Sequence, residues 1–216
     1  MDGTLYPNYQ LYIRLIPFIV RKFPLLLALN KARIRLRSSS HEEFPPEKFY
    51  DIQAVYMAES LNLSPPQAKQ QLEQLVYRGW EPLFTSIPLF DGVRECLQIF
   101  RDSGIKLGIL SDFPPEKKIR NLGIADFFDV LLCSEIIGRL KPNPLPFITL
   151  ARYMELPPEQ ILYVGNSVPY DIIGAKGVGM QTALILPGKK RKSGNRGNAD
   201  FIFSSYRQLS TFVIPL

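Results

Sequence analysis

The spacing of hydrophobic and polar residues divides the chain into two parts. Up to about residue 87 the apolar residues recur near helical spacing, and from residue 88 onward short apolar runs alternate with amphipathic stretches. The first part therefore predicts helices alone, and the second predicts strands that alternate with helices.

The helical part opens with the very apolar stretch Leu11–Leu29. Charged residues and prolines interrupt it, among them Arg14, Pro17 and Pro24, so no continuous run reaches the roughly 20 residues of a membrane span. A signal peptide is excluded, because its features stand in the wrong order and no small-residue cleavage site follows. We predict a pair of buried or substrate-facing helices, with a membrane-surface helix as the alternative.

Two further helices are predicted before residue 87. One covers Glu47–Leu61, and the next opens at Ser64, where Gln67 three residues later completes a capping box. Pro65 at the first helical position supports that start, and the helix is expected to run to about Trp80. The whole segment 7–87 is thus predicted to be helical.

The second part predicts an α/β fold with a parallel sheet. Its predicted strands are Lys106–Leu110, Val130–Cys133, Ile161–Val164, Thr182–Leu186 and Phe201–Phe203. Its predicted helices are Asp91–Arg101, with Asp91 as the cap, then Pro114–Leu122, Pro144–Met154, Ile172–Lys176 and Tyr206–Phe212. Strands that alternate with helices form parallel sheets through right-handed crossovers. Ligands of such sheets bind beyond the carboxyl ends of the strands.

Composition and charge narrow the classes of function. The 216 residues fit one large domain or a core with an insertion. Cys96 and Cys133 lie in apolar segments without metal-ligand spacing, which predicts reduced core thiols in a cytoplasmic protein. The single histidine, His41, argues against a histidine metal site or a Ser-His-Asp triad. Much of the net charge of +6 lies in the loop 188–197, which lacks interleaved aromatic residues and is interpreted as a solvated connection rather than a nucleic-acid site.

Four stretches carry the candidate chemistry. Three of them are the opening Met1–Tyr6 (MDGTLY), the run Lys106–Ser111 with Asp112 after it, and Ile161–Asp171 (ILYVGNSVPYD). The fourth is the step Lys141-Pro142, where proline favours an extended lysine. In each apolar run a polar residue stands at or just after the end of a predicted strand.

Together these stretches resemble the four motifs of the haloacid dehalogenase superfamily, namely D-x-D-G-T, a strand ending in Ser or Thr, a lone Lys and a strand ending in an acidic cluster. The resemblance covers nearly the whole chain. It implies a Rossmann-like parallel sheet core over 1–6 and 88–216, with an inserted helical cap over 7–87 that shapes the substrate pocket.

The resemblance also implies a role for each motif residue. Asp2 is the expected proton donor and later the base, and Lys141 holds the nucleophile and the phosphate by charge. Ser111, Asp112 and Lys141 are the expected phosphate-binding residues. Asp2, Asn166 and Asp171 are the expected ligands of Mg²⁺, which prefers hard oxygens. We expect Lys141→Ala to abolish turnover and to leave the fold intact.

The chain departs from the family pattern in three places. The nucleophilic Asp belongs two positions before Asp2, where this sequence has nothing before Met1. Asn166 is a neutral amide where the phosphatases more often have Asp. Asp112 stands where Asn often follows Ser111, and its charge repels a phosphate unless it faces away or binds a cation.

We therefore expect a cytoplasmic, Mg²⁺-dependent phosphatase of a small phosphorylated metabolite, inactive as given because the nucleophile is missing. No nucleic-acid or membrane partner is expected. Two alternatives stay open, namely a non-catalytic binding protein that kept the fold and a metal-free haloacid dehalogenase.

The start of the chain suggests a further hypothesis. In the family the strand that feeds the first motif lies between the strands ending at Ser111 and Asn166, and unpaired buried backbone groups cost about 1–3 kcal/mol each. We expect the natural protein to begin upstream, with an apolar strand that ends in Asp immediately before Met1.

Overall fold

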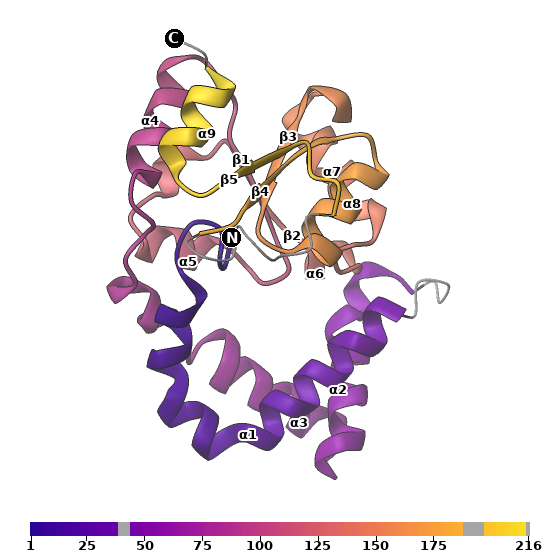
Figure 1. The fold of residues 1–216 in the computed structure, drawn as a ribbon. Helices are drawn as coiled ribbons and strands as arrows, with labels where there is room; N and C mark the ends of the chain where they lie inside the picture. Colours follow the sequence, from indigo (N-terminus) through magenta and orange to yellow (C-terminus); the bar gives the residue numbers. More distant parts are fainter. Residues whose placement is uncertain (39–43, 188–196, 215–216) are drawn as a thin grey trace.

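The computed structural model describes residues 1–38, 44–187 and 197–214. His41 and nearly all of the basic loop 188–197 lie outside these residues. A helical cap, coloured indigo to purple in Figure 1, lies below an α/β core that holds the strands, and the amino terminus lies where the two meet. The cap elements are α1 (Asn8–Ser38), η1 (Pro46–Lys48), α2 (Phe49–Leu61), α3 (Pro65–Leu72), η2 (Glu73–Tyr77) and η3 (Glu81–Ser86).

The first helix spans the apolar stretch that predicted a pair of helices. It is continuous except for a kink at Lys22, where φ is −127° and ψ is 26°. Pro24 lies just beyond the kink and cannot donate the backbone hydrogen bond that would cross it. No helix in the described ranges has the length and apolar character to cross a membrane.

The cap has a hydrophobic centre of its own. Buried side chains of α1 pack there against α2 and α3, namely Leu25, Ala28, Leu29, Ala32, Met57, Ala58, Ala68 and Leu72. The predicted capping box opens α3, since the Ser64 N–H donates to Gln67 Oε1 at 3.0 Å. Regular α-helix ends earlier than the predicted Trp80, because the chain passes into the π-helical turn η2 at Glu73.

The core alternates strands and helices as predicted. Its strands are β1 (Gly108–Ser111), β2 (Val130–Cys133), β3 (Leu162–Gly165), β4 (Gln181–Ile185) and β5 (Phe201–Phe203), and every pairing between them is parallel. Its helices are α4 (Val93–Asp102), α5 (Glu116–Asn121), α6 (Ser134–Ile137), α7 (Pro144–Met154), α8 (Ile173–Gly177) and α9 (Tyr206–Val213). The α/β fold class is confirmed.

One predicted cap is wrong. Asp91 was expected to begin α4, but the residue at the N-cap is Gly92, with φ of 79°, and no side-chain hydrogen bond caps the helix. The left-handed glycine turns the chain into the helix one residue later, which leaves Asp91 outside it. The two cysteines agree with the prediction, since Cys96 and Cys133 are buried free thiols.

The strands form two sheets rather than one. β1 pairs with β2, with Ser111 opposite Cys133, and β3, β4 and β5 form a second sheet, with Gly165 opposite Leu184. Among the described residues no backbone ladder joins β1 to β3. The interruption falls where the sequence was expected to lack a central strand.

Helices cover the strands on both sides. α4 and α9 lie together on one side, and α7 and α8 lie on the other (Figure 1). Each side has its own hydrophobic cluster, one around Phe100, Phe203 and Leu209 and the other around Phe147 and Met154. The carboxyl ends of β1 and β3 are thereby held toward the cap.

Candidate active site

Lys141 and Asp171 form a buried ion pair beside the carboxyl end of β3. The Lys141 Nζ lies 2.6 Å from Asp171 Oδ1 and 3.2 Å from the hydroxyl of Tyr163. The two ion-pair residues are 7% and 4% exposed. The other oxygen of Asp171 accepts backbone N–H bonds from Asn166 at 3.2 Å and Ser167 at 3.0 Å. Two residues expected to act on phosphate and metal therefore bind each other.

Each member of this pair fixes the charge of the other. Burial alone raises the pKa of Asp171, but the ammonium of Lys141 outweighs it and holds that pKa below its usual value. Burial likewise opposes the charge of Lys141, and the nearby carboxylates raise its pKa well above the ordinary value. The premise of the Lys141→Ala expectation, that Lys141 lies outside the core, is wrong, because Lys141 is buried. We now expect that change to destabilise the fold, since removing one partner leaves an uncompensated buried charge.

Gly165 allows the close approach of Asp171. A Cβ placed on Gly165 would lie 2.4 Å from the Asp171 Cβ, which is far inside van der Waals contact. The glycine that ends β3 thus admits the turn η6 (Val168–Ile172), which carries Asp171.

Asp2 forms a second pair, with a lysine that the sequence did not indicate. Lys118, on α5, lies 2.8 Å from Asp2 Oδ1, and the Tyr6 hydroxyl donates to the same oxygen. Burial raises the pKa of Asp2, but Lys118, the amino-terminal ammonium of Met1 and the hydrogen bonds outweigh it and lower the pKa to about 2. Nothing in the helical pattern of α5 distinguishes Lys118 from Lys117, so only the three-dimensional arrangement identifies it.

Asn166 packs against the opening motif. Its Oδ1 accepts a hydrogen bond from Thr4 Oγ1 at 3.3 Å. Gly3 has φ of +71°, and a Cβ there would lie 2.4 Å from the Asn166 Nδ2. The Gly of the first motif is therefore required both by its left-handed backbone and by the neighbouring amide.

Asp112 pairs with cations. This is one of the two arrangements expected to relieve its repulsion of a phosphate, the other being a side chain that faces away. Its Oδ2 lies 2.9 Å from Arg37 and 3.8 Å from Arg33, both on α1 of the cap, and its Oδ1 accepts the Lys141 N–H at 3.2 Å. Burial raises the pKa of Asp112, and the surrounding cations lower it below its usual value. Beside it, Ser111 Oγ accepts the Phe113 N–H at 3.3 Å, and its own O–H proton is available to an oxygen of a ligand.

Arg33 also joins cap and core, through the buried carboxylate of Glu135. Arg33 pairs with Glu135 at the start of α6, and the Tyr77 hydroxyl lies 2.9 Å from both oxygens of that carboxylate. Glu135 is 0% exposed and Arg33 is 6% exposed. Sequence reasoning missed this cluster, which links α1, η2 and the core.

Mg²⁺ is the metal that the motifs imply, and the donor atoms can be compared with its chemistry. Among the residues the structure describes, no three His, Cys, Asp or Glu side chains gather as a metal site. Asp171 has both oxygens engaged, and Asn166 Oδ1 accepts one hydrogen bond, from Thr4. Asp2 Oδ2 and Asn166 Oδ1 are hard oxygens of the kind that Mg²⁺ binds. These two donors therefore fit the ion, but the site that they form carries little negative charge.

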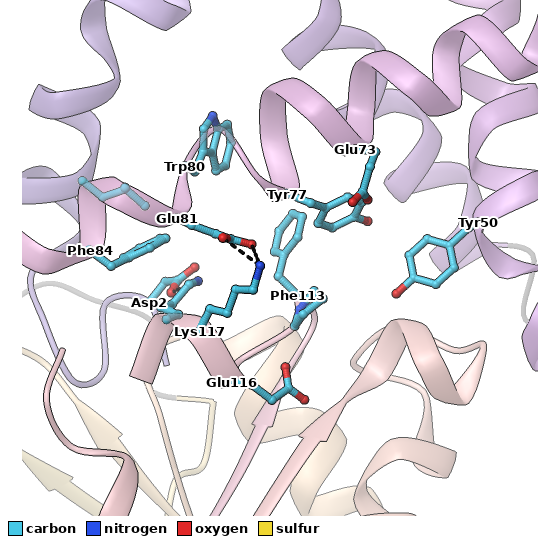
Figure 2. Close-up of a pocket in the computed structure, with 13 residues that line it drawn as sticks. Asp2, Tyr50, Glu73, Tyr77, Trp80, Glu81, Phe84, Phe113, Glu116 and Lys117 are labelled. Atoms are coloured by element: carbon cyan, nitrogen blue, oxygen red, sulfur yellow. Dashed lines mark hydrogen bonds and ion pairs between the residues drawn. The ribbon is translucent and has the colours of Figure 1, made fainter. Parts of the chain in front are cut away.

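A pocket of about 320 Å³ opens from Asp2 between cap and core. Figure 2 shows the cap side chains Trp80, Glu81 and Tyr77 facing Phe113 and Lys117 of the core across it, with the ion pair between Glu81 and Lys117 bridging the two parts at 3.0 Å. An aliphatic and aromatic lining with a few polar groups is typical of a small-molecule site.

Comparison with known proteins places these features in context. Residues 1–179 match the family model described as haloacid dehalogenase-like hydrolase. The glyceraldehyde 3-phosphate phosphatase of Methanopyrus kandleri is 37% identical over 120 residues, which are 54% of this chain and 52% of that protein. A phosphoglycolate phosphatase of Haemophilus influenzae is 26% identical over 155 residues, 70% of this chain and 69% of that protein. The chain spans about half the length of the first curated relatives that it matches.

Solved structures share the fold at low identity. A HAD phosphatase from Thermococcus onnurineus superposes with a TM-score of 0.63 at 19% identity, over 99% of this chain and 95% of that one. A 2-haloacid dehalogenase from Pseudomonas syringae gives a TM-score of 0.65 at 21% identity, again over 99% and 95%. Phosphatases and dehalogenases are both among the neighbours, so the fold does not distinguish the two reactions.

Proposed function

This chain belongs to the haloacid dehalogenase-like hydrolases, and from that premise we propose that it is a Mg²⁺-dependent phosphatase of a small phosphorylated metabolite. The observation that supports the proposal is a pocket large enough for a metabolite that opens from Asp2, with Ser111 at the end of β1 and the Lys141–Asp171 pair beside the end of β3. A cytoplasmic location belongs to the same proposal and is supported by two buried free thiols.

The roles of the residues follow from their surroundings. Ser111 donates its hydroxyl proton to a phosphoryl oxygen, and Lys141 supplies positive charge from a rigid position fixed by Asp171. Asp112 orients the loop around Lys141 through the Lys141 N–H and is neutralised by the cap arginines. The phosphoryl group thus meets donors and a cation although a carboxylate is adjacent.

Asp2 is ionised before substrate binds, because its pKa is about 2. It therefore carries no proton in the free protein. A phosphoryl dianion beside it raises its pKa and prepares it to carry a proton to the leaving oxygen, since like charges disfavour the ionised form. Lys118 limits that rise for as long as it stays 2.8 Å away.

Mg²⁺ would be held by oxygens of Asp2 and Asn166, and in this family of reactions it neutralises phosphoryl charge. The neutral amide at position 166 makes this a weak site by charge. The proposed reaction needs a nucleophilic Asp, which the family pattern has two positions before Asp2.

The test is a panel of phosphorylated metabolites offered to two proteins, the 216-residue chain and a chain extended by an apolar strand ending in Asp. We expect phosphate release from the extended chain and none from the shorter one. Release of halide from 2-haloacids without phosphate release would contradict the proposal and favour a dehalogenase. Genomic DNA with an in-frame stop directly upstream of Met1, and no codons for such a strand, would refute the extension.

A second candidate is a phosphate-binding protein without catalysis. The observation that favours it is the pairing of Lys141 with Asp171, which satisfies both groups within the protein and does not require a nucleophile. Phosphate binding by both proteins with turnover by neither would support this candidate.

A further inference from the structure

The pocket beside Asp2 has an unusual concentration of aromatic rings. The five that line it are Tyr50, Tyr77, Trp80, Phe84 and Phe113. Three of them form a continuous row, because Tyr50 and Tyr77 meet edge to face at 6.0 Å and Tyr77 and Phe113 at 5.9 Å. In Figure 2 Asp2 lies toward Phe84 on one side of the pocket, and Tyr50 lies on the opposite side.

The rings of this pocket already attract cations. The guanidinium of Arg33 lies 4.1 Å from the centre of the Phe113 ring, and the ammonium of Lys118 lies 4.7 Å from that of Phe84. Ring faces carry negative potential, so a cation within about 6 Å of a ring centre is stabilised. Phe113 and Phe84 already hold cations of the protein, so a positively charged group of a ligand would meet the other rings of the lining, Tyr50, Tyr77 and Trp80.

The net charge of the pocket lining also favours a cationic ligand. Carboxylates outnumber ammonium groups, with Asp2, Glu73, Glu81 and Glu116 against Lys117 and Lys118. Both lysines are engaged by carboxylates of the same lining, Lys117 by Glu81 at 3.0 Å and Lys118 by Asp2 at 2.8 Å. Glu73 pairs outside the lining with Arg78 at 2.8 Å, so the negative charge left over is that of Glu116.

We propose that the substrate is a phosphate monoester whose alcohol carries an alkylated ammonium group. This inference rests on the proposed function, because it places the phosphoryl group at Asp2, Ser111 and Lys141 and the alcohol in the aromatic pocket. Methylated ammonium combines a positive charge with apolar surface, and both match a lining of rings and carboxylates. A second anionic group on the alcohol meets excess negative charge and is rejected.

Calorimetry on the 216-residue chain tests the inference without any need for turnover. The probes are phosphocholine, its uncharged isostere 3,3-dimethylbutyl phosphate, phosphoglycolate and inorganic phosphate. A cation–π contribution of about 0.5–2 kcal/mol corresponds to binding of phosphocholine roughly two- to thirty-fold tighter than its isostere. Phosphoglycolate is expected to bind more weakly than either.

The variant that tests the leftover carboxylate is Glu116→Gln, a change at an exposed position. It is expected to bring phosphocholine and its isostere close to equal affinity, whereas Glu47→Gln, an exposed change outside the lining, is expected to leave the preference unchanged. Equal binding of the two esters by the unaltered chain, or tighter binding of phosphoglycolate, would overturn the inference and leave the proposed function standing. If no probe binds, inorganic phosphate included, both are contradicted.

Discussion

The two lysine–carboxylate pairs near the strand ends differ in what surrounds them. Lys141 and Asp171 are closed off from solvent, and every oxygen of Asp171 has a partner within the protein. Lys118 and Asp2 line the open pocket, and the side chain of Asp2 is 37% exposed. The closed pair, Lys141–Asp171, is suited to hold its ammonium in place. In the open pair, Lys118–Asp2, the pKa of Asp2 is suited to change when a ligand enters the pocket.

This difference determines what each pair contributes. Charges removed from water are stabilised only while both members are present, so the closed pair is a structural requirement as well as a phosphate site. An exposed carboxylate is screened by solvent, and its main property is the position of its pKa. The variants below separate these two properties.

The largest effect is expected from Lys141→Met. It leaves the Asp171 carboxylate buried without a cation, and such losses cost about 3–5 kcal/mol. Urea unfolding measures the change, and phosphate release in the extended chain is expected to disappear as well. Lys117→Met serves as the control, because its pair with Glu81 is exposed, at 64% and 30%, and is expected to contribute no more than about 1 kcal/mol.

A second change distinguishes charge from packing in the same pair. Adding Asp171→Asn to Lys141→Met removes the uncompensated charge, so the double variant is expected to be more stable than Lys141→Met alone. A double variant that is less stable would show that the cost came from lost packing or backbone bonds and not from the unpaired carboxylate.

Arg33→Met tests whether burial produces so large a cost in a second buried ion pair, that of Arg33 with Glu135. Glu135 is fully buried and would lose its ion pair with Arg33, so we expect a loss of about 3 kcal/mol in urea unfolding. Arg101→Met is the matched control, since its partner Asp129 is 39% exposed and such pairs contribute no more than about 1 kcal/mol. Equal losses in the two variants would contradict the importance of burial.

The sequence predicted Lys141 and Asp171 as site residues but did not predict that they form an ion pair. The order and spacing of the motifs identified Lys141 and Asp171, and the alternation of apolar runs predicted every strand of the core. Lys118, Arg33 and Glu135 could not be found in this way, because they come together from α5, α1 and α6, and no local pattern records which helix faces meet across the cap. Asp112 was predicted only in part. Its position after Ser111 raised the question of a cation, and only the structure identified Arg33 and Arg37 as its partners.

Lys118→Met addresses the open pair through the pKa of Asp2. That pKa is about 2 in the folded chain and 3.8 for an ordinary aspartate, so the ionised pair stabilises the fold above about pH 4 and loses that contribution as the pH falls toward 2. Without Lys118 the pKa is expected to rise, and this part of the acid dependence is expected to flatten. Carbon-13 NMR titration of the Asp2 carboxyl measures the shift directly.

Lys117→Met is again the control for this titration, because Lys117 binds Glu81 instead of Asp2. It is expected to leave the pKa of Asp2 where it is. A pKa that stays at about 2 in Lys118→Met would mean that the amino-terminal ammonium and the Tyr6 hydrogen bond, and not Lys118, set the value.

The smallest effect is expected from Asn166→Asp, which adds a charge between the two pairs. If position 166 is a metal ligand, the new carboxylate tightens Mg²⁺ binding by about tenfold in the extended chain, because one added unit charge near a divalent ion contributes on the order of 1–2 kcal/mol even in water. The same carboxylate adjoins Asp171, so without Mg²⁺ it is expected to lower stability slightly. Calorimetry measures the binding, and Asn62→Asp, an exposed change in the cap, controls for net charge. Binding that is equal or weaker in Asn166→Asp would remove position 166 from the metal site and leave Asp2 as the only one of the three expected ligands with a side-chain oxygen to offer.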